Sequence, residues 1–213
     1  HPDRVDFLRE LAPDLARRDF TVNAMAADAA GAVTDLFGGQ DDLRRGVIRC
    51  VGDPAERFAE DALRMLRALR FAARLSFRID GETAAAIHAA RTRLRAVAPE
   101  RLHKELGGIL CGRQAAALLE EFSDVLFELI PELAPCQGFR QYNPHHTRDV
   151  WTHTLAVVDG VPPEEPLRLA ALLHDAGKPA TFFFDKNLVG HFYGHPAAGA
   201  AVTEEVLRRL RYD

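Results

Sequence analysis

The feature that most constrains this fold is a change of periodicity at Asp53. From Asp53 to about Leu133, apolar residues recur every three or four positions, and the segment shows no alternation typical of a strand. Asp53 can cap a helix, and Pro54 suits the first helical turn. The segment therefore predicts a series of helices with these sequences: DPAERFAEDALRMLRALRFAARLSF, GETAAAIHAARTRLRAV, APERLHKELGGIL and RQAAALLEEFSDVLFELI.

The segments on either side have a different character. Before Asp53, DFTVNAMAADAAG carries a weak helical signal, and the runs GAVTDLF and GVIRCV predict two strands separated by a compact glycine-containing loop or helical turn. After Leu133, the proline-rich run PELAPCQGFRQYNP predicts a linker. Beyond it, TRDVWTHTLAVVDG, LRLAALLHDAGK and PAAGAAVTEEVLRRLRYD predict helices, and TFFFDKNLVGHFYG predicts a hairpin.

The composition allows a substantial core. Of the 213 residues, 47% are hydrophobic and the formal net charge is -4, so overall charge gives no sign of nucleic-acid binding. No apolar run is long enough to span a membrane. The cysteines, Cys50, Cys111 and Cys136, lie far apart, which favours reduced thiols and a cytoplasmic location. The start, HPDRVDFLRE, has neither an initiator Met nor a signal peptide, and LRRLRYD stops inside a helical pattern, so we expect a piece of a longer protein.

The stretch EDALR, Glu60 to Arg64, contains a pair of side chains that can read a base. On a helix, Asp61 and Arg64 are three residues apart and lie on one face. An ionised carboxylate only accepts hydrogen bonds, and a guanidinium only donates them. Cytosine and adenine present an amino donor beside a ring-nitrogen acceptor, which suits this pair, whereas uracil and guanine present the reverse. We therefore predict that Asp61 and Arg64 select C and A, because a mismatched base leaves buried polar groups unpaired.

The arginines that follow extend the same surface. Arg67, Arg70 and Arg74 continue at spacings of three and four and predict a basic stripe suited to phosphates. Glu60 is expected to orient the neighbouring arginines or to stabilise the helix start. The alternative is a solvated, charged helix with local ion pairs, which is the usual meaning of such a short motif.

The surroundings of EDALR favour the functional interpretation. LARRDFTVNAMA precedes it, and DLFGGQDDLRRGVIRCVGDPAERFAEDALRMLRALRFAARLSF contains it. These strings resemble the class II tRNA nucleotidyltransferases, which are the CCA-adding enzymes, and the related bacterial poly(A) polymerases. The resemblance implies ATP and CTP as substrates, the tRNA 3′ end as partner and Mg²⁺ as the cofactor of transfer. It also implies that Asp61 and Arg64 act as a protein template for base selection.

The same resemblance assigns roles to the motif RRDFTVN. It implies that Asp19 and Asn23 bind ribose hydroxyls and that Arg18 meets the triphosphate; an acid and an amide are chemically suited to hydroxyls. The nucleotide-binding residues expected from the sequence are Arg18, Asp19, Asn23, Asp61, Arg64, Arg67 and Arg70. Arg101 and Glu105 match a later family motif and are expected to brace the neck helices, with a plain surface pair as the alternative.

The catalytic carboxylates are not expected within this sequence. Nucleotidyl transfer usually needs two divalent ions held by carboxylates. In the family these form a D-x-D pair after a Gly-Ser element, and residues 1–16 contain neither. We expect the pair upstream of His1, and we expect no nucleotide transfer by these 213 residues alone.

The histidine-rich C-terminal part resembles an HD domain, which binds divalent metal. Six of the nine histidines lie between His145 and His195. The resemblance implies metal ligands at His153, His174, Asp175 and His195, while the closing aspartate of the pattern is not visible. Lys178 is expected to contact phosphate, and Trp151 is expected in the core. The alternative is an RNA-handling or packing module whose histidines are ordinary polar residues.

The sequence therefore predicts a mainly α fold in three parts. These are the C-terminal part of an α+β nucleotidyltransferase head (1–52), an all-helical neck and body with the nucleotide-selecting helix (53–135), and the N-terminal part of a helical HD domain with a small hairpin (141–213). Four functions stay open: CCA addition, poly(A) or CC-only or A-only addition, metal-dependent phosphohydrolysis by the HD part, and binding of tRNA or a partner without catalysis. The oligomeric state is left open.

Overall fold

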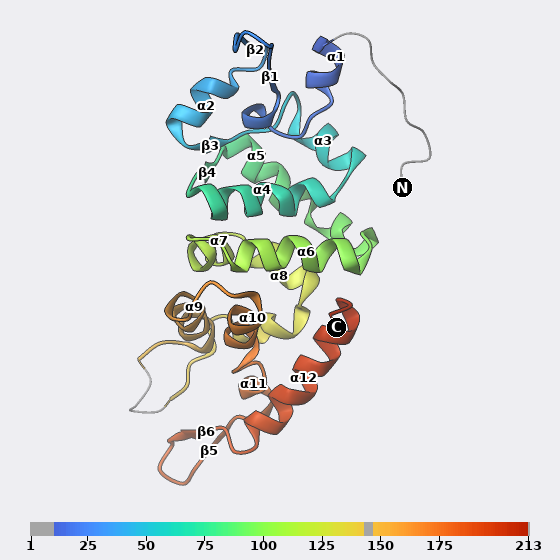
Figure 1. The fold of residues 1–213 in the computed structure, drawn as a ribbon. Coiled ribbons are helices and arrows are strands. Elements are labelled where there is room, and N and C mark those ends of the chain that lie inside the picture. The colour runs from blue at the N-terminus through green and yellow to red at the C-terminus, as the bar shows by residue number, and fades with distance from the viewer. Residues whose placement is uncertain (1–10, 143–146, 213) are drawn as a thin grey trace.

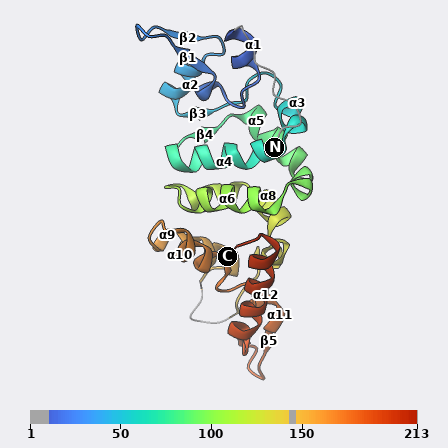
Figure 2. The same cartoon turned by 45° about the vertical axis from the view of Figure 1, so that its right-hand side comes forward.

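The computed structural model describes residues 11–142 and 147–212. The elements follow one another as layers, from the short strands and helices of the N-terminal part, through two layers of helices, to a helical region with a projecting hairpin (Figure 1). Figure 2 shows the same order of layers from a second direction. The expectations that involve residues 1–10 and His145 lie outside the described residues.

The N-terminal part mixes short helices and strands, as predicted. Its elements are α1 (Leu11–Ala16), the 3₁₀ turn η1 (Thr21–Asn23), β1 (Met25–Ala27), β2 (Val33–Asp35), α2 (Gly39–Arg45) and β3 (Val47–Ile48). Strands β1 and β2 pair antiparallel, with Met25 opposite Asp35. The weak helical signal over DFTVNAMAADAAG is misleading, because this segment forms η1 and β1 instead.

Hydrogen bonds that backbone amides donate to one carboxylate explain why the chain reverses after β1. Oδ1 of Asp28 accepts hydrogen bonds from the amides of Ala30 and Ala32, both at 2.9 Å. The turn includes Gly31 at φ 85°, a left-handed conformation that glycine adopts without strain. Aspartate competes in this way with helical hydrogen bonds, so the chain turns back and forms β2.

The long run after Asp53 is two helices rather than one. The elements here are α3 (Pro54–Glu60), α4 (Leu63–Leu75), β4 (Arg78–Ile79), α5 (Gly81–Ala90) and the 3₁₀ helix η2 (Arg91–Ala96). Asp53 caps α3 as predicted, accepting a hydrogen bond from the amide of Ala55 at 2.8 Å. The break falls at Asp61, which is extended (φ -149°, ψ 106°). Its Oδ1 accepts a hydrogen bond from the amide of Leu63 at 3.0 Å, so the side chain stabilises the start of α4.

Strand β4 was not expected from the sequence. It pairs in parallel with β3, with Ile48 opposite Ile79. A two-residue strand is too short to show alternation, and its partner lies far away in the sequence. Tertiary contact alone therefore creates this pairing.

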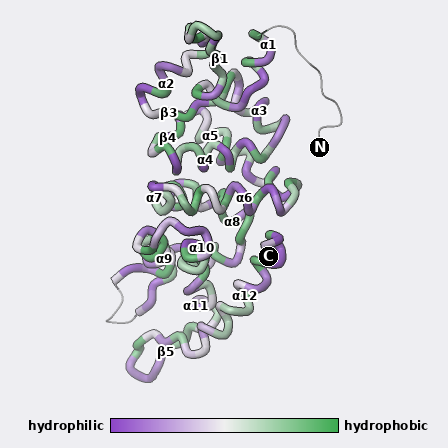
Figure 3. Tube along the Cα trace, in the orientation of Figure 1, coloured by the Kyte–Doolittle hydropathy of each residue, from purple (hydrophilic) through white to green (hydrophobic). Residues whose placement is uncertain are grey.

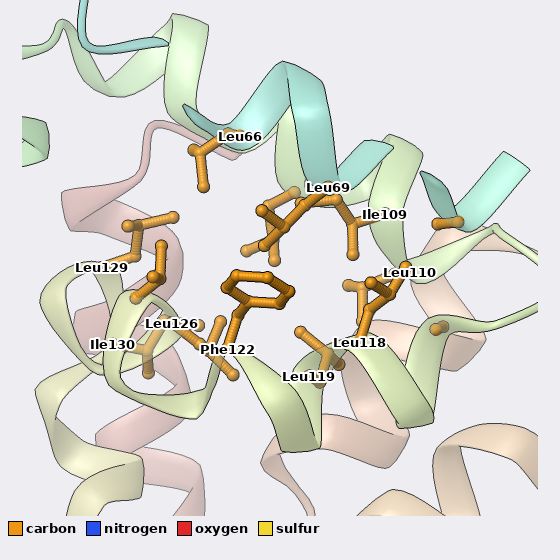
Figure 4. Close-up of a cluster of buried hydrophobic side chains, with 14 of the residues drawn as sticks. Leu66, Leu69, Ile109, Leu110, Leu118, Leu119, Phe122, Leu126, Leu129 and Ile130 are labelled. Atoms are coloured by element: carbon orange, nitrogen blue, oxygen red, sulfur yellow. The ribbon is translucent and has the colours of Figure 1, made fainter. Parts of the chain in front are cut away.

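The centre of the core lies between α4 and the next helices. These are α6 (Pro99–Leu110), α7 (Ala115–Glu121), α8 (Ser123–Leu129) and the 3₁₀ helix η3 (Pro131–Cys136). Figure 4 shows Phe122 pointing into a cluster that includes Leu69 of α4 and Ile109 of α6. Phe122 is 0% exposed, and its backbone ends α7 (φ -111°, ψ 36°). The single helix expected over residues 113–130 is therefore wrong, because the chain bends to bury this ring.

The proline-rich segment after α8 is packed rather than loose. Leu133 and Cys136 of η3 are each 1% exposed and belong to the same apolar cluster as the helices on both sides. Along α4 and α6 hydrophobic and hydrophilic residues alternate (Figure 3), as expected for helices with one buried face. The linker predicted here is wrong for η3, since its apolar side chains join the core.

The C-terminal part is helical with one hairpin, as predicted. Its elements are α9 (Val150–Gly160), α10 (Glu165–Leu173), α11 (Lys178–Thr181), β5 (Phe183–Phe184), β6 (Gly190–His191) and α12 (His195–Arg209). Trp151 is 1% exposed, which confirms its place in the core. Arg209 donates two hydrogen bonds to Glu132, both at 2.7 Å, which anchor α12 on η3 and hold the pKa of Glu132 below its usual value.

The mainly α fold class is confirmed. Within the described ranges, no helix combines the length and the apolarity needed to cross a membrane. Cys50, Cys111 and Cys136 are free thiols, in agreement with the expectation.

Candidate functional site

Three segments that are distant in the sequence line one polar pocket. Its volume is about 380 Å³, and its lining side chains are Arg17, Arg18, Asp19, Asn23, Asp61, Leu63, Arg64, Arg67 and Arg101. They come from the segment after α1, from the junction of α3 and α4 with the first part of α4, and from the start of α6. Six of the seven predicted nucleotide-binding residues lie here, and Arg70 does not.

Asp19 and Asn23 hold each other in place. Asp19 is only 7% exposed, and Asn23 Nδ2 donates to its Oδ1 at 2.8 Å. Arg67 Nε donates to Asp19 Oδ2 at 2.6 Å and neutralises the buried carboxylate. Asn23 Oδ1 in turn accepts a hydrogen bond from the amide of Phe20 at 3.3 Å. The two residues expected to meet ribose hydroxyls are therefore adjacent and fixed in orientation.

Asp61 and Arg64 line the same pocket, but they do not share one helix face. Asp61 stands in the break between α3 and α4, so the expectation of one continuous helix face is wrong. Arg101 Nη2 donates to Asp61 Oδ2 at 2.7 Å. Arg64 donates to the carbonyl of Arg17 at 3.3 Å and to the carboxylate of Glu60 at 2.6 Å. Each of the two predicted base-reading groups is thus oriented by partners of its own.

Glu60 orients arginines, as predicted. Its carboxylate lies 2.7 Å from a guanidinium nitrogen of Arg57 and 2.6 Å from one of Arg64. Glu60 does not line the pocket; it holds Arg64, which does. Its role is therefore to position another residue.

Arg101 and Glu105 brace the neck, and they do so with different partners. Arg101 binds Asp61, while Glu105 Oε2 accepts a hydrogen bond from Arg70 Nε at 2.5 Å. Glu105 is only 6% exposed, so the alternative of a plain surface pair is wrong. Both contacts join α6 to α4 or to the break before it.

Arg70 is therefore displaced from its predicted role. A step of three residues rotates a side chain by about 300° around a helix, so successive arginines drift away from the face of Arg64. Arg70 reaches α6, where Glu105 holds it. We expect Arg70 to support the helix pair rather than the nucleotide. Arg17 and Arg101, which line the pocket, were not predicted as nucleotide contacts although both lie within the quoted motifs.

The predicted metal ligands also converge. Ligand atoms of His153, His174 and Asp175 all lie within 4.8 Å of one another. Oδ2 of Asp175 is 3.6 Å from His153 Nε2 and 3.1 Å from His174 Nε2. Nε2 of His195 is 3.9 Å from Asp175 Oδ1. Helix α9, the end of α10 and the start of α12 supply these side chains.

The state of Asp175 fits a site for a cation. It is 4% exposed, and its Oδ2 has no hydrogen-bond partner of proper geometry among the described residues, although Lys178 Nζ lies 2.8 Å away. Burial disfavours the charged carboxylate, but the contacts with His174 and Lys178 outweigh this and hold the pKa of Asp175 well below its usual range. An ionised carboxylate beside imidazole nitrogens suits a divalent transition metal.

Lys178 does not face solvent, contrary to the expected phosphate contact. It is 6% exposed, and its ammonium donates to Gln141 Oε1 at 2.8 Å. The same nitrogen lies 5.4 Å from the centre of the Phe192 ring. Lys178 therefore supports the cluster from inside the domain.

Comparisons with known proteins match the regions that contain the two sites. The poly A polymerase head domain matches residues 1–49, the probable RNA and SrmB-binding site of polymerase A matches residues 76–136, and the HD domain matches residues 145–213. The CCA-adding enzyme of Ligilactobacillus salivarius is 42% identical over 159 residues, which cover 71% of this chain and 39% of that protein. The chain belongs to the family of class II CCA-adding enzymes and poly(A) polymerases. It spans about two fifths of the length of this curated relative.

Solved structures of CCA-adding enzymes share the fold. The Bacillus stearothermophilus CCA-adding enzyme in complex with CTP matches with a TM-score of 0.54 and 27% identity, over 96% of this chain and 59% of that one. The Thermotoga maritima CCA-adding enzyme complexed with tRNA matches with a TM-score of 0.58 and 26% identity, over 93% of this chain and 44% of that one. The head, RNA-binding and HD regions expected from the sequence are therefore those of a CCA-adding nucleotidyltransferase homologue.

Proposed function

We propose that this chain is part of a tRNA nucleotidyltransferase that adds C and A, taken from CTP and ATP, to tRNA 3′ ends. One observation carries the proposal. The carboxylates, the amide and the arginines that nucleotide binding requires come from distant segments of the chain, and they line a single pocket. We further propose that residues 1–52, 53–135 and 141–213 act as head, neck and body, and HD domain.

Asp61 and Arg64 are proposed to read the base. The carboxylate of Asp61 accepts a hydrogen bond from the exocyclic amino group of cytosine or adenine, and Arg64 donates one to the neighbouring ring nitrogen. Uracil and guanine meet both groups with the wrong partner, which leaves polar atoms unpaired. Glu60 holds Arg64 in position, and Arg101 holds Asp61.

The rest of the pocket is proposed to bind the sugar and the phosphates. Asp19 and Asn23 hydrogen-bond the ribose hydroxyls, since the bond from Asn23 Nδ2 to Asp19 Oδ1 keeps the two side chains adjacent. Arg18, which is exposed, supplies positive charge to the triphosphate. Arg67 holds the Asp19 carboxylate in its orientation and lines the pocket itself.

Transfer itself is proposed to need carboxylates that are not among these residues. Mg²⁺ held by a carboxylate pair activates the RNA 3′-hydroxyl and stabilises the leaving pyrophosphate. No D-x-D occurs in the 213 residues. We therefore propose that the chain binds and selects the nucleotide but does not transfer it unaided.

The test is nucleotide addition by a longer protein that contains both this sequence and the carboxylate pair. With a tRNA that lacks its 3′ end and each nucleotide offered separately, we expect C from CTP, then A from ATP, and no addition from UTP or GTP. Long runs of A would instead indicate a poly(A) polymerase, and CC or A alone an enzyme with part of the activity. Comparable addition from UTP would contradict the proposed selection. The 213-residue chain tested in parallel should show none.

A second proposed function concerns the HD region, where four potential ligands converge. We propose that His153, His174, Asp175 and His195 hold a divalent metal ion, as in a metal-dependent phosphohydrolase. Elemental analysis of the purified chain should find about one ion per chain, and His174→Ala should remove it. His88→Ala is the matched control, because His88 lies on α5 against Asp124. Equal metal content in both variants would contradict the site, and a phosphodiesterase assay of the loaded chain separates binding from hydrolysis.

A further inference from the structure

The hairpin β5–β6 has one face packed and one face open. Its register places Phe183 opposite His191, and side chains alternate between the two faces of a strand. On the packed face, Phe182 lies 5.3 Å from Phe139 and Phe184 lies 5.2 Å from Tyr142, measured between ring centres. These contacts attach the hairpin to the segment after η3. The other face carries its own set of rings.

Three rings gather on the open face: Phe183, His191 and Tyr193. The His191 and Tyr193 rings are stacked, with centres 5.2 Å apart and planes 25° apart. The ring of Phe183 lies 5.5 Å from His191 and 5.4 Å from Tyr193. Phe183 is 41% exposed and Tyr193 73%. The stack therefore ends in a tyrosine ring that is open to solvent.

Hydrogen-bond contacts of Asp185 hold the His191 ring of this stack in place. His191 Nε2 lies 3.1 Å from Asp185 Oδ2. The other carboxylate oxygen of Asp185 accepts hydrogen bonds from the amides of Asn187 and Val189, at 2.8 and 2.9 Å. The turn and the histidine ring thus share one anchor. A fixed ring loses little freedom when it stacks on a ligand.

The position of the stack indicates what kind of ligand it meets. Tyr193 is two residues before His195, whose ring lies 3.9 Å from Asp175 in the metal-competent cluster. A cation in that cluster attracts phosphate. Lys186, in the turn of the same hairpin, is exposed and has no ion-pair partner among the described residues. Open aromatic rings beside positive charge are the elements of a surface that binds single-stranded nucleic acid.

We propose that Phe183, His191 and Tyr193 bind unpaired nucleotides of an RNA by stacking on their bases. This site is separate from the nucleotide pocket, because the hairpin and the α1–α3 region lie at opposite ends of the molecule (Figures 1 and 2). The inference therefore does not depend on nucleotide selection by Asp61 and Arg64. Stacking tolerates any base, so the site recognises single strands rather than a sequence.

The experiment measures binding of a fluorescently labelled hexa-adenylate to the whole chain by anisotropy. Tyr193→Ala should weaken binding about 5- to 150-fold, the range for removal of one stacking ring. Tyr193→Phe, which keeps the ring, should bind as the original chain does. Leu188→Ala is the matched control, because Leu188 is 76% exposed in the same hairpin and lies outside the stack.

A second probe separates stacking from attraction to phosphate. An abasic hexamer has the same phosphates and no bases, so it should bind more weakly, and Tyr193→Ala should leave its affinity unchanged. The proposal is overturned if the hexa-adenylate does not bind, or if Tyr193→Ala binds it within twofold of the original chain. It is also overturned if sedimentation shows that the open face joins two copies of the chain and Tyr193→Ala separates them. Loss of CTP and ATP selection would bear on the proposed function alone.

Discussion

Asp61→Ala and Arg64→Ala are each expected to lower the preference for CTP and ATP over UTP and GTP by about 100-fold. The physical reason is that a site built from buried donors and acceptors rejects a wrong base by leaving them unpaired, and each variant removes half of that penalty. The measurement is kcat/KM for all four nucleotides, in a protein that carries both this sequence and the catalytic carboxylates. The expected change is in the ratio of kcat/KM values: kcat/KM for UTP and GTP should rise relative to kcat/KM for CTP and ATP.

Asp61 also has a structural role, which the design must separate from selection. Its side chain accepts a hydrogen bond from the amide of Leu63, and loss of such a cap costs about 1 kcal/mol. Asp61→Asn keeps a capping oxygen but places an amide donor where the base requires an acceptor. It should therefore lose selectivity with little change in thermal stability. Arg74→Ala is the matched control, because Arg74 is exposed in the last turn of α4 and lies outside the pocket. Unchanged preference in all three pocket variants would refute base reading by this pair.

Glu105→Ala is expected to destabilise the fold by about 3 kcal/mol, because it leaves the Arg70 guanidinium without its partner between two packed helices. The side chains of Arg70 and Glu105 are 22% and 8% exposed, so solvent replaces the lost contact poorly. The stem of Arg70 crosses α6 closely: a Cβ at Gly108 would lie 2.4 Å from Arg70 Cδ. The guanidinium therefore has little freedom to swing toward water. For a chain of this size the expected fall in Tm is about 6 to 12 °C.

Thermal and urea unfolding, followed by circular dichroism, measure this effect. The control is Glu205→Ala, which removes the surface partner of Arg208 and should cost at most about 1 kcal/mol. Arg70→Met combined with Glu105→Leu should recover much of the loss, because an apolar pair leaves no buried charge. A Glu105→Ala variant no less stable than the surface control would show that this ion pair does not brace the neck.

The helical middle of the chain could be predicted because its signal is local. The cap at Asp53, the apolar period and the prolines at helix starts all act within one or two turns. The errors fall where a distant contact changes a local preference. The break at Asp61, the bend at Phe122 and the two-residue strand β4 each involve a distant partner, which is Arg101 for Asp61, the apolar cluster for Phe122 and β3 for β4.

The candidate sites show the same contrast between what local sequence indicates and what distant contacts decide. Donor and acceptor chemistry was enough to nominate Asp61 and Arg64, and the family resemblance nominated Asp19, Asn23 and the histidines with Asp175. Spacing along an ideal helix also nominated Arg70, which the structure turns toward Glu105. Composition misled at η3, since prolines usually indicate a linker, and here Pro131 and Pro135 lie in a turn whose apolar side chains are buried.

The sequence by itself determined the family, the helical class of the body and the residue types available for base selection and metal binding. Only the tertiary structure decided which of those residues meet. It brings Arg101 of α6 to Asp61, turns Arg70 away from the pocket and gathers side chains of α9, α12 and the end of α10 around Asp175. The physical reason is that secondary structure depends on neighbours within a few residues, whereas a pocket depends on the packing of segments far apart in the chain.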